Sequence, residues 1–252
     1  MSWQGVGEAY ADSYAALCAG TGESLRALAG EAGGRSLLDV GSGDGTLAAE
    51  WASVGWQVTA CEPEPSMRAV SAKRHPGVPV GDGALPHLPF DDDAFDAVAA
   101  NFVLNHLADP RAGAAELQRV SRGIVVASIW TQSSTRIWAD VTQRAGLAPA
   151  SGGLLPKEKD FDRTVTGFER MLRDASWRPE VIELTWTWRP EPRTLWRSVD
   201  GGVAGVGSFF RGLPDADRRR FRVAFDEVVA ERAEDGRVPL TQTAAIAVDR
   251  TH

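Results

Sequence analysis

Ser36-Leu37-Leu38-Asp39-Val40-Gly41-Ser42-Gly43-Asp44-Gly45-Thr46-Leu47 turns an apolar run directly into closely spaced glycines. A strand that is buried on both faces of a sheet reads as a continuous apolar run. Glycine lets the backbone bend sharply and approach a ligand closely. Small and apolar residues then recur at helical spacing over 47–52. The stretch therefore predicts a strand at 36–40, a tight turn, and a helix from about Gly45 whose free N–H groups point at a ligand.

The glycine spacing narrows the class of ligand. Glycine-rich turns between a strand and a helix also bind pyrophosphates in dinucleotide enzymes and triphosphates in P-loop enzymes. No Gly-Lys-Ser/Thr follows this turn, and Thr46 stands where a dinucleotide fingerprint has a small residue. Asp39 precedes the first glycine, where its charge would repel a pyrophosphate and attract a cation. These residues favour a cationic ligand such as a sulfonium.

An acidic residue followed by Gly-x-Gly-x-Gly resembles motif I of the class I S-adenosylmethionine-dependent methyltransferases. Further signals of this family follow in order over residues 35–130. The resemblance implies an α/β enzyme with a Rossmann-like, seven-stranded, mostly parallel sheet, an antiparallel last strand and helices on both faces. It also implies S-adenosylmethionine as cofactor, bound in part by Asp39, Gly41, Ser42 and Gly43.

Apolar runs and their periodicity place the other elements. The expected strands after the first are 57–61, 78–80, 94–100, 123–130, 181–188 and 242–248, with a helix at 167–177. Residues 1–34 are expected to form a helical arm that glycines interrupt at 20–22, and residues 35–252 the methyltransferase domain. Segments 131–160 and 190–238 exceed the minimal fold and leave the edge of the sheet where sites form. We expect them to be helical lid insertions that set substrate choice. An apolar stripe on the second, including Phe221 and Phe225, is predicted to be core.

Glu62 ends the second expected strand. A carboxylate there can accept hydrogen bonds from both ribose hydroxyls, and the same position serves NAD enzymes. The sequence 62–67 resembles the acid-x-x-x-Ser-Met pattern of the family, in which Pro63 and Met67 flank the adenine. The alternative is that Met67 is only the first core residue of the next helix.

Two later strand ends complete the expected cofactor site. Asp82, with Gly83 and Ala84 after it, resembles the family residue that accepts a hydrogen bond from the adenine amine; the alternative is an ordinary turn. The fourth strand ends near Asn101 and Phe102, at the edge where active sites of open α/β sheets form. By resemblance, the backbone there would hold the amino group of the methionine part.

Two side chains are candidates for catalysis. His106 follows the fourth strand, and the usual pKa of a histidine, ~6.5, suits a general base. Alternatively it only lines the pocket or caps a helix. Tyr14 lies in the arm, which in the resembled family closes over the cofactor, so it is expected to reach the methionine carboxylate or the reacting methyl. Alternatively it packs the arm onto the body.

Composition limits the partners. The chain has 252 residues, of which 43% are apolar and 24% charged, with a net charge of −7, which disfavours a nucleic-acid partner. Cys18 and Cys61 predict neither a disulfide framework nor a metal site. The triplet 91–93 lies in one polar loop, and no metal ligand is predicted there. No signal pattern or membrane span is evident, so we expect a cytoplasmic protein without a membrane partner. The oligomeric state is not indicated.

A sulfonium methyl is already activated, so such an enzyme mainly holds a nucleophile in line with the methyl–sulfur bond and excludes water. The chain lacks the Asn-Pro-Pro-Tyr/Phe and Pro-Cys signatures that the resembled base-methylating enzymes use. We therefore expect methyl transfer, by in-line displacement, to a small and apolar or aromatic metabolite. The alternatives are a methyltransferase acting on nucleic acid or protein, an NAD-dependent oxidoreductase, and a non-catalytic S-adenosylmethionine-binding protein.

Overall fold

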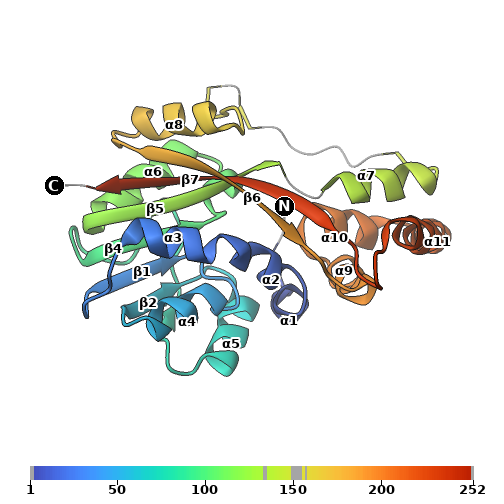
Figure 1. Ribbon diagram of the computed structural model, residues 1–252, viewed down its shortest axis with the longest axis horizontal. Coiled ribbons are helices and arrows are strands. Elements are labelled where there is room, and N and C mark those ends of the chain that lie inside the picture. Colours follow the sequence, from blue (N-terminus) through green and yellow to red (C-terminus); the bar gives the residue numbers. More distant parts are fainter. Residues whose placement is uncertain (1–2, 133–134, 149–154, 157, 251–252) are drawn as a thin grey trace.

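A seven-stranded sheet forms the centre of the computed structural model, which describes residues 3–132, 135–148, 155–156 and 158–250 (Figure 1). The strands are β1 (Ser36–Val40), β2 (Gln57–Cys61), β3 (Val80–Gly81), β4 (Phe95–Asn101), β5 (Ser121–Gln132), β6 (Glu180–Trp188) and β7 (Leu240–Arg250). Their order is β3-β2-β1-β4-β5-β7-β6, and β7 is antiparallel to both of its neighbours. The other neighbouring pairs are parallel. The predicted sheet is confirmed.

Some predicted boundaries move by a few residues. The third strand begins later than the expected residue 78, because the amide of Val78 donates to the carbonyl of His75 in a turn at 3.0 Å. The expected helix at 167–177 is α8, Val165–Asp174. Thr164 caps it, since its hydroxyl accepts a hydrogen bond from the amide of Gly167 at 3.0 Å.

Helices cover both faces of the sheet (Figure 1). The two core clusters show that α6 (Pro110–Arg119) and α8 pack on one face, and α3 (Gly22–Ala29) and α4 (Thr46–Ser53) on the other. Along β4, Val98 and Ala100 join the first cluster, whereas Ala97 and Ala99 join the second. Side chains of a strand alternate between faces, so a sheet buried on both faces requires the unbroken apolar run of the sequence.

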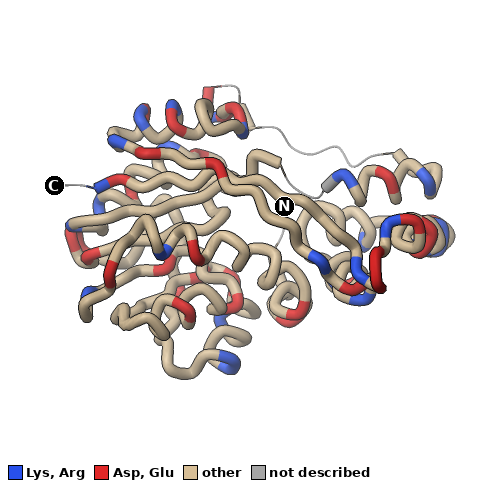
Figure 2. Tube along the Cα trace, in the orientation of Figure 1, with Lys and Arg blue, Asp and Glu red and all other residues tan. Residues whose placement is uncertain are grey.

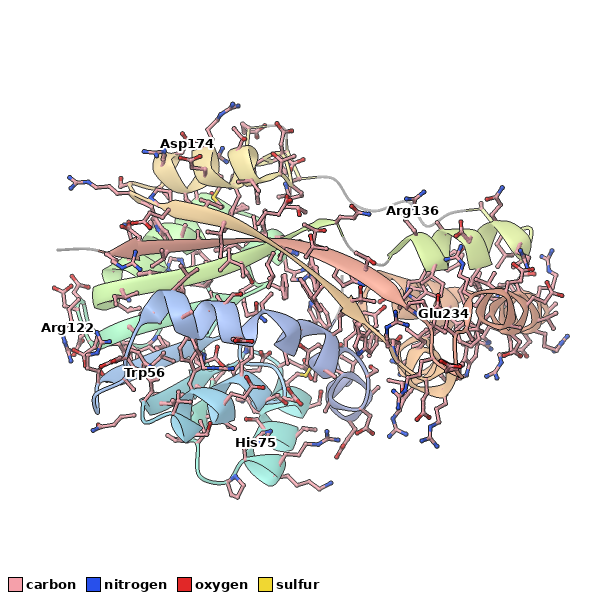
Figure 3. The ribbon with its side chains drawn as sticks, in the orientation of Figure 1. Trp56, His75, Arg122, Arg136, Asp174 and Glu234 are labelled. Atoms are coloured by element: carbon pink, nitrogen blue, oxygen red, sulfur yellow. The ribbon has the colours of Figure 1, made fainter. Side chains whose placement is uncertain are left out.

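The helix α5 (Pro65–Arg74) lies beside β3. Labelled side chains mark the two faces of the sheet. Figure 3 shows Asp174 of α8 on one side of the sheet, and Trp56 and His75 on the other. Arg136 and Glu234 lie beyond the strand ends, toward a further group of helices (Figure 3).

The first part of the chain is helical, with α1 (Gly7–Ala11), α2 (Tyr14–Cys18), a short 3-10 helix (Ala19–Thr21) and α3. The glycines expected to break the arm at 20–22 lie in this 3-10 helix and at the start of α3. Asn101 at the end of β4 donates to the carbonyl of Cys18 at 3.0 Å and accepts from the hydroxyl of Thr21 at 2.8 Å. These bonds fix the arm to the carboxyl end of the sheet.

Four helices gather beyond the carboxyl ends of the parallel strands (Figure 1). They are α7 (Thr135–Arg144), α9 (Pro192–Asp200), α10 (Ala204–Gly212) and α11 (Asp215–Arg232). They share a core of their own, which we call the outer core, and Phe221 and Phe225 lie in it at 0% and 1% exposure. The apolar stripe predicted on α11 is therefore buried core.

Charges of both signs are interspersed along the outer elements (Figure 2). On α11, Arg220 pairs with Asp217 at 2.6 Å and Arg222 with Asp226 at 2.9 Å. Both arginines are thus paired with acids of their own helix. In the part of the chain that the structure describes, no helix has the length and apolarity needed to cross a membrane.

Candidate functional site

The turn after β1 has a conformation that only glycine adopts readily. Gly41, Gly43 and Gly45 have positive φ angles of 67°, 57° and 82°. A Cβ on Gly45 would lie 2.3 Å from Oγ of Ser71, and one on Gly43 would lie 3.1 Å from Cε1 of Tyr10. Both the backbone and the close neighbours therefore require the glycines that mark this turn in the sequence. The helix after it, α4, begins at Thr46, one residue later than expected.

Hydrogen bonds hold the turn against β2. The amides of Gly41 and Ser42 donate to the carbonyl of Cys61 at 2.8 and 3.1 Å. The amide of Gly43 donates to Oε2 of Glu62 at 3.0 Å. Glu62 is 8% exposed, and burial raises the pKa of its carboxyl. The carboxylate predicted to bind a ribose thus lies directly against the glycine turn.

Three acids surround the turn. Asp39 is 2% exposed, and its Oδ2 has no hydrogen-bond partner among the described residues. Burial, with the neighbouring charges of Glu62 and Asp44, raises the pKa of Asp39 to about 7. Burial also raises the pKa of Asp44, which is 4% exposed and accepts from the hydroxyl of Thr46 at 2.8 Å. A cation bound here would favour the ionised carboxyls, so the turn suits a positively charged ligand.

A cavity of about 810 Å³ begins at this turn and reaches α7 and α10. Most of the predicted site residues line it, namely Tyr14, Gly41, Gly43, Glu62, Pro63, Met67, Gly83, Ala84, Asn101, Phe102 and His106. Its far end is largely apolar and includes Trp130 from β5, Trp138 from α7, and Val206 and Phe209 from α10. The structure therefore joins the predicted cofactor residues to an aromatic chamber under the outer helices.

Three predicted residues do not line this cavity. Asp39 is buried beneath the turn, and Ser42 has a buried hydroxyl that finds no partner within the described chain. The side chain of Asp82 is 75% exposed and accepts from Nη1 of Arg68 at 3.0 Å. Its predicted contact with an adenine amine requires the carboxylate to turn away from this arginine.

An aromatic stack forms the wall behind the end of β4. Phe102 has a φ of 58°, and its amide donates to the hydroxyl and carbonyl oxygens of Ser128 at 3.0 and 3.2 Å. Its ring lies 3.7 Å from that of Trp130 and is parallel to it within 2°. Trp186 continues the stack, with its centroid 5.5 Å from that of Trp130. Strained backbone of this kind persists where the surroundings fix it. Here the stacked rings of Phe102 and Trp130 line the cavity.

His106 lies in the same wall. Its ring packs edge-on against Trp3, with centroids 5.4 Å apart, and its Nε2 lies 3.3 Å from Nδ2 of Asn105. Burial is the main cause that lowers the pKa of His106 to about 4, and the charge of Arg163 is a smaller one. The ring is therefore neutral at pH 7, and its Nε2 accepts from the Asn105 amide. Its predicted role as a general base stays a prediction, and this pKa makes it a weak base.

Tyr14 joins the arm to the outer helices. Its hydroxyl accepts a hydrogen bond from Nε1 of Trp138 at 2.9 Å, and its ring packs edge-on against Trp188 at 6.1 Å. Burial raises the pKa of its phenol. Tyr14 thus lines the cavity and also bridges α2 and α7, so it packs the arm onto the body. Its expected contact with the cofactor or the reacting methyl stays a prediction.

Among the polar residues of the cavity that sequence reasoning missed are Tyr10, Cys18 and Arg163. Burial raises the pKa of Tyr10 well above its usual value and that of Cys18 to about 12, so both are neutral at pH 7. The helical spacing of the arm gives a signal for Tyr10. Arg163 comes from a loop more than fifty residues beyond His106, and nothing in its local sequence indicates the cavity.

Comparisons with known proteins indicate the family to which the chain belongs. The methyltransferase domain family matches residues 38–126. The chain is 26% identical over 193 residues to a demethylmenaquinone methyltransferase of Streptomyces avermitilis, covering 71% of this chain and 78% of that protein. It is 28% identical over 244 residues to a malonyl-[acyl-carrier protein] O-methyltransferase of Serratia marcescens, covering 94% and 89%.

A solved structure shares the fold. It is phosphoethanolamine N-methyltransferase 2 of Haemonchus contortus in complex with S-adenosyl-L-methionine, with a TM-score of 0.53 and 15% identity. The match covers 92% of this chain and 53% of that one. The glycine turn, the sheet order and the methyltransferase domain match lead to one assignment. The chain belongs to the class I S-adenosylmethionine-dependent methyltransferases.

Proposed function

We propose that this enzyme transfers the methyl group of S-adenosylmethionine to a small, apolar or aromatic acceptor by in-line displacement. The observation that carries the proposal is the cavity of about 810 Å³, which connects the glycine turn with an aromatic chamber. The cofactor supplies a methyl group already activated on a positively charged sulfur. The protein's contribution is then to position the acceptor and exclude water. Such positioning can lower the activation free energy of the transfer by ~7–11 kcal/mol.

The residues around the turn fit this cofactor. The buried Oδ2 of Asp39 and the hydroxyl of Ser42 have no partners within the described residues, and a Cβ at Gly43 would narrow the cradle against Tyr10. We propose that Glu62 accepts hydrogen bonds from the ribose hydroxyls. The raised pKa of Asp39 supports a role as a nearby negative charge that forms when a cation is present.

The proposed adenine site lies between β2 and β3. Pro63 and Met67 line the cavity at the start of α5 and are placed to flank the ring, and Gly83 and Ala84 border it. The Asp82 carboxylate would bind the exocyclic amine after leaving Arg68. The backbone at Asn101 and Phe102 is assigned to the methionine amino group. Because an ammonium group only donates hydrogen bonds, backbone carbonyls at this strand end would accept them.

The aromatic chamber supports an acceptor that is small and apolar. Trp130, Trp138 and Phe209 line it, and a net charge of −7 disfavours a nucleic-acid partner. The two relatives above are named for a quinone precursor and for an acyl group on a carrier protein. Neither name refers to a nucleic acid, which agrees with a small-molecule acceptor.

The first test is calorimetric titration with S-adenosylmethionine, S-adenosylhomocysteine and NADH. We expect both sulfur ligands to bind and NADH not to bind; preference for NADH would refute the proposal. Glu62→Ala should weaken binding of S-adenosylhomocysteine by about tenfold or more, through lost ribose hydrogen bonds. Glu183→Ala, at an exposed residue of β6, is the matched control and should leave the affinity unchanged. Transfer of labelled methyl to a panel of phenols, indoles and aromatic acids then identifies the acceptor.

A further inference from the structure

The acceptor end of the cavity contains a cation. Arg163 is the one lysine or arginine that lines the cavity within residues 3–132, 135–148, 155–156 and 158–250. The one acid among the described lining residues is Glu62, which lies against the glycine turn. Neighbours of Arg163 in this lining are otherwise apolar or neutral. Outside this lining, Asp160 pairs with one edge of the guanidinium, and the side chain of Arg163 is 32% exposed.

The loop that carries Arg163 is held at both ends. On one side, Nζ of Lys159 pairs with Asp109 of the α6 cap at 3.1 Å. On the other, Thr164 caps α8, and a Cβ at Gly167 would lie 2.2 Å from the carbonyl oxygen of Asp162, so the loop packs tightly there. The position of Arg163 is therefore set by the ends of two helices that pack on the sheet.

The guanidinium is oriented from one side. Its Nη1 donates to Oδ1 of Asp160 at 2.6 Å and to the carbonyl of Phe161, and its Cζ lies 3.9 Å from the centre of the Phe161 ring. A guanidinium carries five N–H donors in a planar fork. No hydrogen bond from Nε or Nη2 to a described residue is present. These donors are left for a ligand.

A second donor lies in the same cavity wall. Nε2 of His106 lies 3.3 Å from Nδ2 of Asn105; in the tautomer in which this amide donates to Nε2, the proton of the neutral ring is on Nδ1, which can donate. The buried Oδ1 of Asn105 has no partner among the described residues. Arg163, His106 and Asn105 thus line the same cavity, and the charge of Arg163 acts on the His106 ring.

We infer that the acceptor of this enzyme carries a carboxylate, which Arg163 binds, while its apolar body lies against Trp130, Trp138 and Phe209. The inference rests on the proposed methyl transfer and deepens it by naming the chemical class of the acceptor. A planar fork of N–H groups matches the two oxygens of a carboxylate, and such charge-assisted hydrogen bonds are about twice as strong as neutral ones. By binding this carboxylate, Arg163 would determine which acceptors the enzyme selects.

Two probes of the same shape test the inference. 2-Naphthoate carries the carboxylate, and 2-naphthamide replaces it with a neutral amide. Each is titrated into the protein saturated with S-adenosylhomocysteine, with tryptophan fluorescence and calorimetry as readouts. We expect the acid to bind about tenfold or more tightly than the amide. Arg163→Gln should abolish this preference by weakening the acid alone. Arg173→Gln is the control, because Arg173 pairs with Glu169 on the exposed side of α8 and does not line the cavity.

Three results would overturn the inference: equal affinity for acid and amide in the natural protein, no binding of the acid up to its solubility limit, or an unchanged preference in Arg163→Gln. Circular dichroism and binding of S-adenosylhomocysteine show that each variant is folded. Arg163 belongs to the proposed acceptor end, so its variant should bind S-adenosylhomocysteine normally. Failure of the natural protein to bind S-adenosylhomocysteine would instead refute the proposed function.

Discussion

Burial changes the acidity of Asp39, the acidic residue that precedes the glycine turn. Its carboxyl is 2% exposed and lies near the acids Asp44 and Glu62, so its pKa rises to about 7. In water an aspartate ionises near ~3.9. The folded protein therefore binds a proton more tightly than the unfolded chain between about pH 4 and 7. A ligand of positive charge would release that proton, which links cofactor binding to pH.

The same shift makes stability depend on pH. Because the folded state holds the extra proton, the contribution of Asp39 to the free energy of unfolding falls as pH rises from about 4 to about 7. Asp39→Asn keeps the size of the side chain and stays neutral. We expect this variant to be more stable than the natural protein at pH 8 by about 1 kcal/mol or more, with a smaller difference at pH 5.

Urea unfolding at both pH values measures this difference. Asp91→Asn, at an exposed loop residue, is the control for the substitution itself. If Asp39→Asn is less stable than the natural protein at pH 8 but not at pH 5, the carboxyl of Asp39 is ionised and paired in the folded state.

His106 gives a second prediction at this scale. Since burial lowers its pKa to about 4, its imidazole should titrate below about pH 5 in the cofactor-free protein. Turnover should then show no dependence on this group between pH 6 and 8. NMR titration of the ring protons measures the midpoint, and His106→Gln assigns the signal among the four histidines of the chain. A midpoint between 6 and 7 would restore the general-base interpretation.

At the scale of elements, the turn between β1 and α4 depends on contacts made far along the chain. The Cβ site of Gly45 is filled by Ser71 of α5, and its φ is 82°. We expect Gly45→Ala to lower the free energy of unfolding by ~1–3 kcal/mol, because both backbone strain and overlap with Ser71 oppose it. Gly77→Ala is the matched control, since a Cβ there meets nothing within 4 Å. Thermal and urea unfolding compare the two, and an equal effect would show that the turn relaxes freely.

The elements were predictable where the pattern is local. Strands such as 36–40 and 57–61 are continuous apolar or alternating runs, and the structure has them at Ser36–Val40 and Gln57–Cys61. The glycine turn and Glu62 follow from spacing alone, and both lie in the cavity wall. The stripe on α11 likewise marks a buried face, because helical periodicity records which side is covered.

What the sequence could not supply depends on contacts between distant segments. Burial among residues such as Trp3 lowers the pKa of His106, and Asp82 pairs with Arg68 from a neighbouring helix. Arg163 reaches the cavity only because its loop is held between α6 and α8. No local pattern encodes such encounters, since each requires the fold to be formed first.

At the scale of the molecule, the cavity lies between two hydrophobic cores. One consists of the sheet with its covering helices, and the other is the outer core of α7, α9, α10 and α11. Trp138 belongs to the outer core, lines the cavity and donates to Tyr14 of the arm at 2.9 Å. Trp138, Val206 and Phe209 of the cavity lining thus belong to the outer core or pack against it, whereas the glycine turn follows β1 of the sheet.

This division predicts that the two ends can be destabilised separately. Phe225 is 1% exposed, and its ring lies 5.8 Å from that of Trp138. Phe225→Ala should lower the free energy of unfolding by ~3–5 kcal/mol, and most of the loss should fall on the outer core. Hydrogen exchange should then speed up in α7, α9, α10 and α11, with little change in β1 and β4. Affinity for S-adenosylhomocysteine should stay within about threefold, because the glycine turn packs on the sheet.

Phe168→Ala provides the comparison, because Phe168 is 0% exposed under α8 in the core of the sheet. It removes the same side chain at a similar depth, so its overall cost should be similar. Its faster exchange should appear in α8, β4 and β5, while the outer helices keep their protection. If both variants instead accelerate exchange uniformly across the chain, the two cores unfold as one cooperative unit. In that case the aromatic chamber and the glycine turn would open with the same free energy of unfolding. Changes in the outer helices would then alter cofactor binding as strongly as they alter the choice of acceptor.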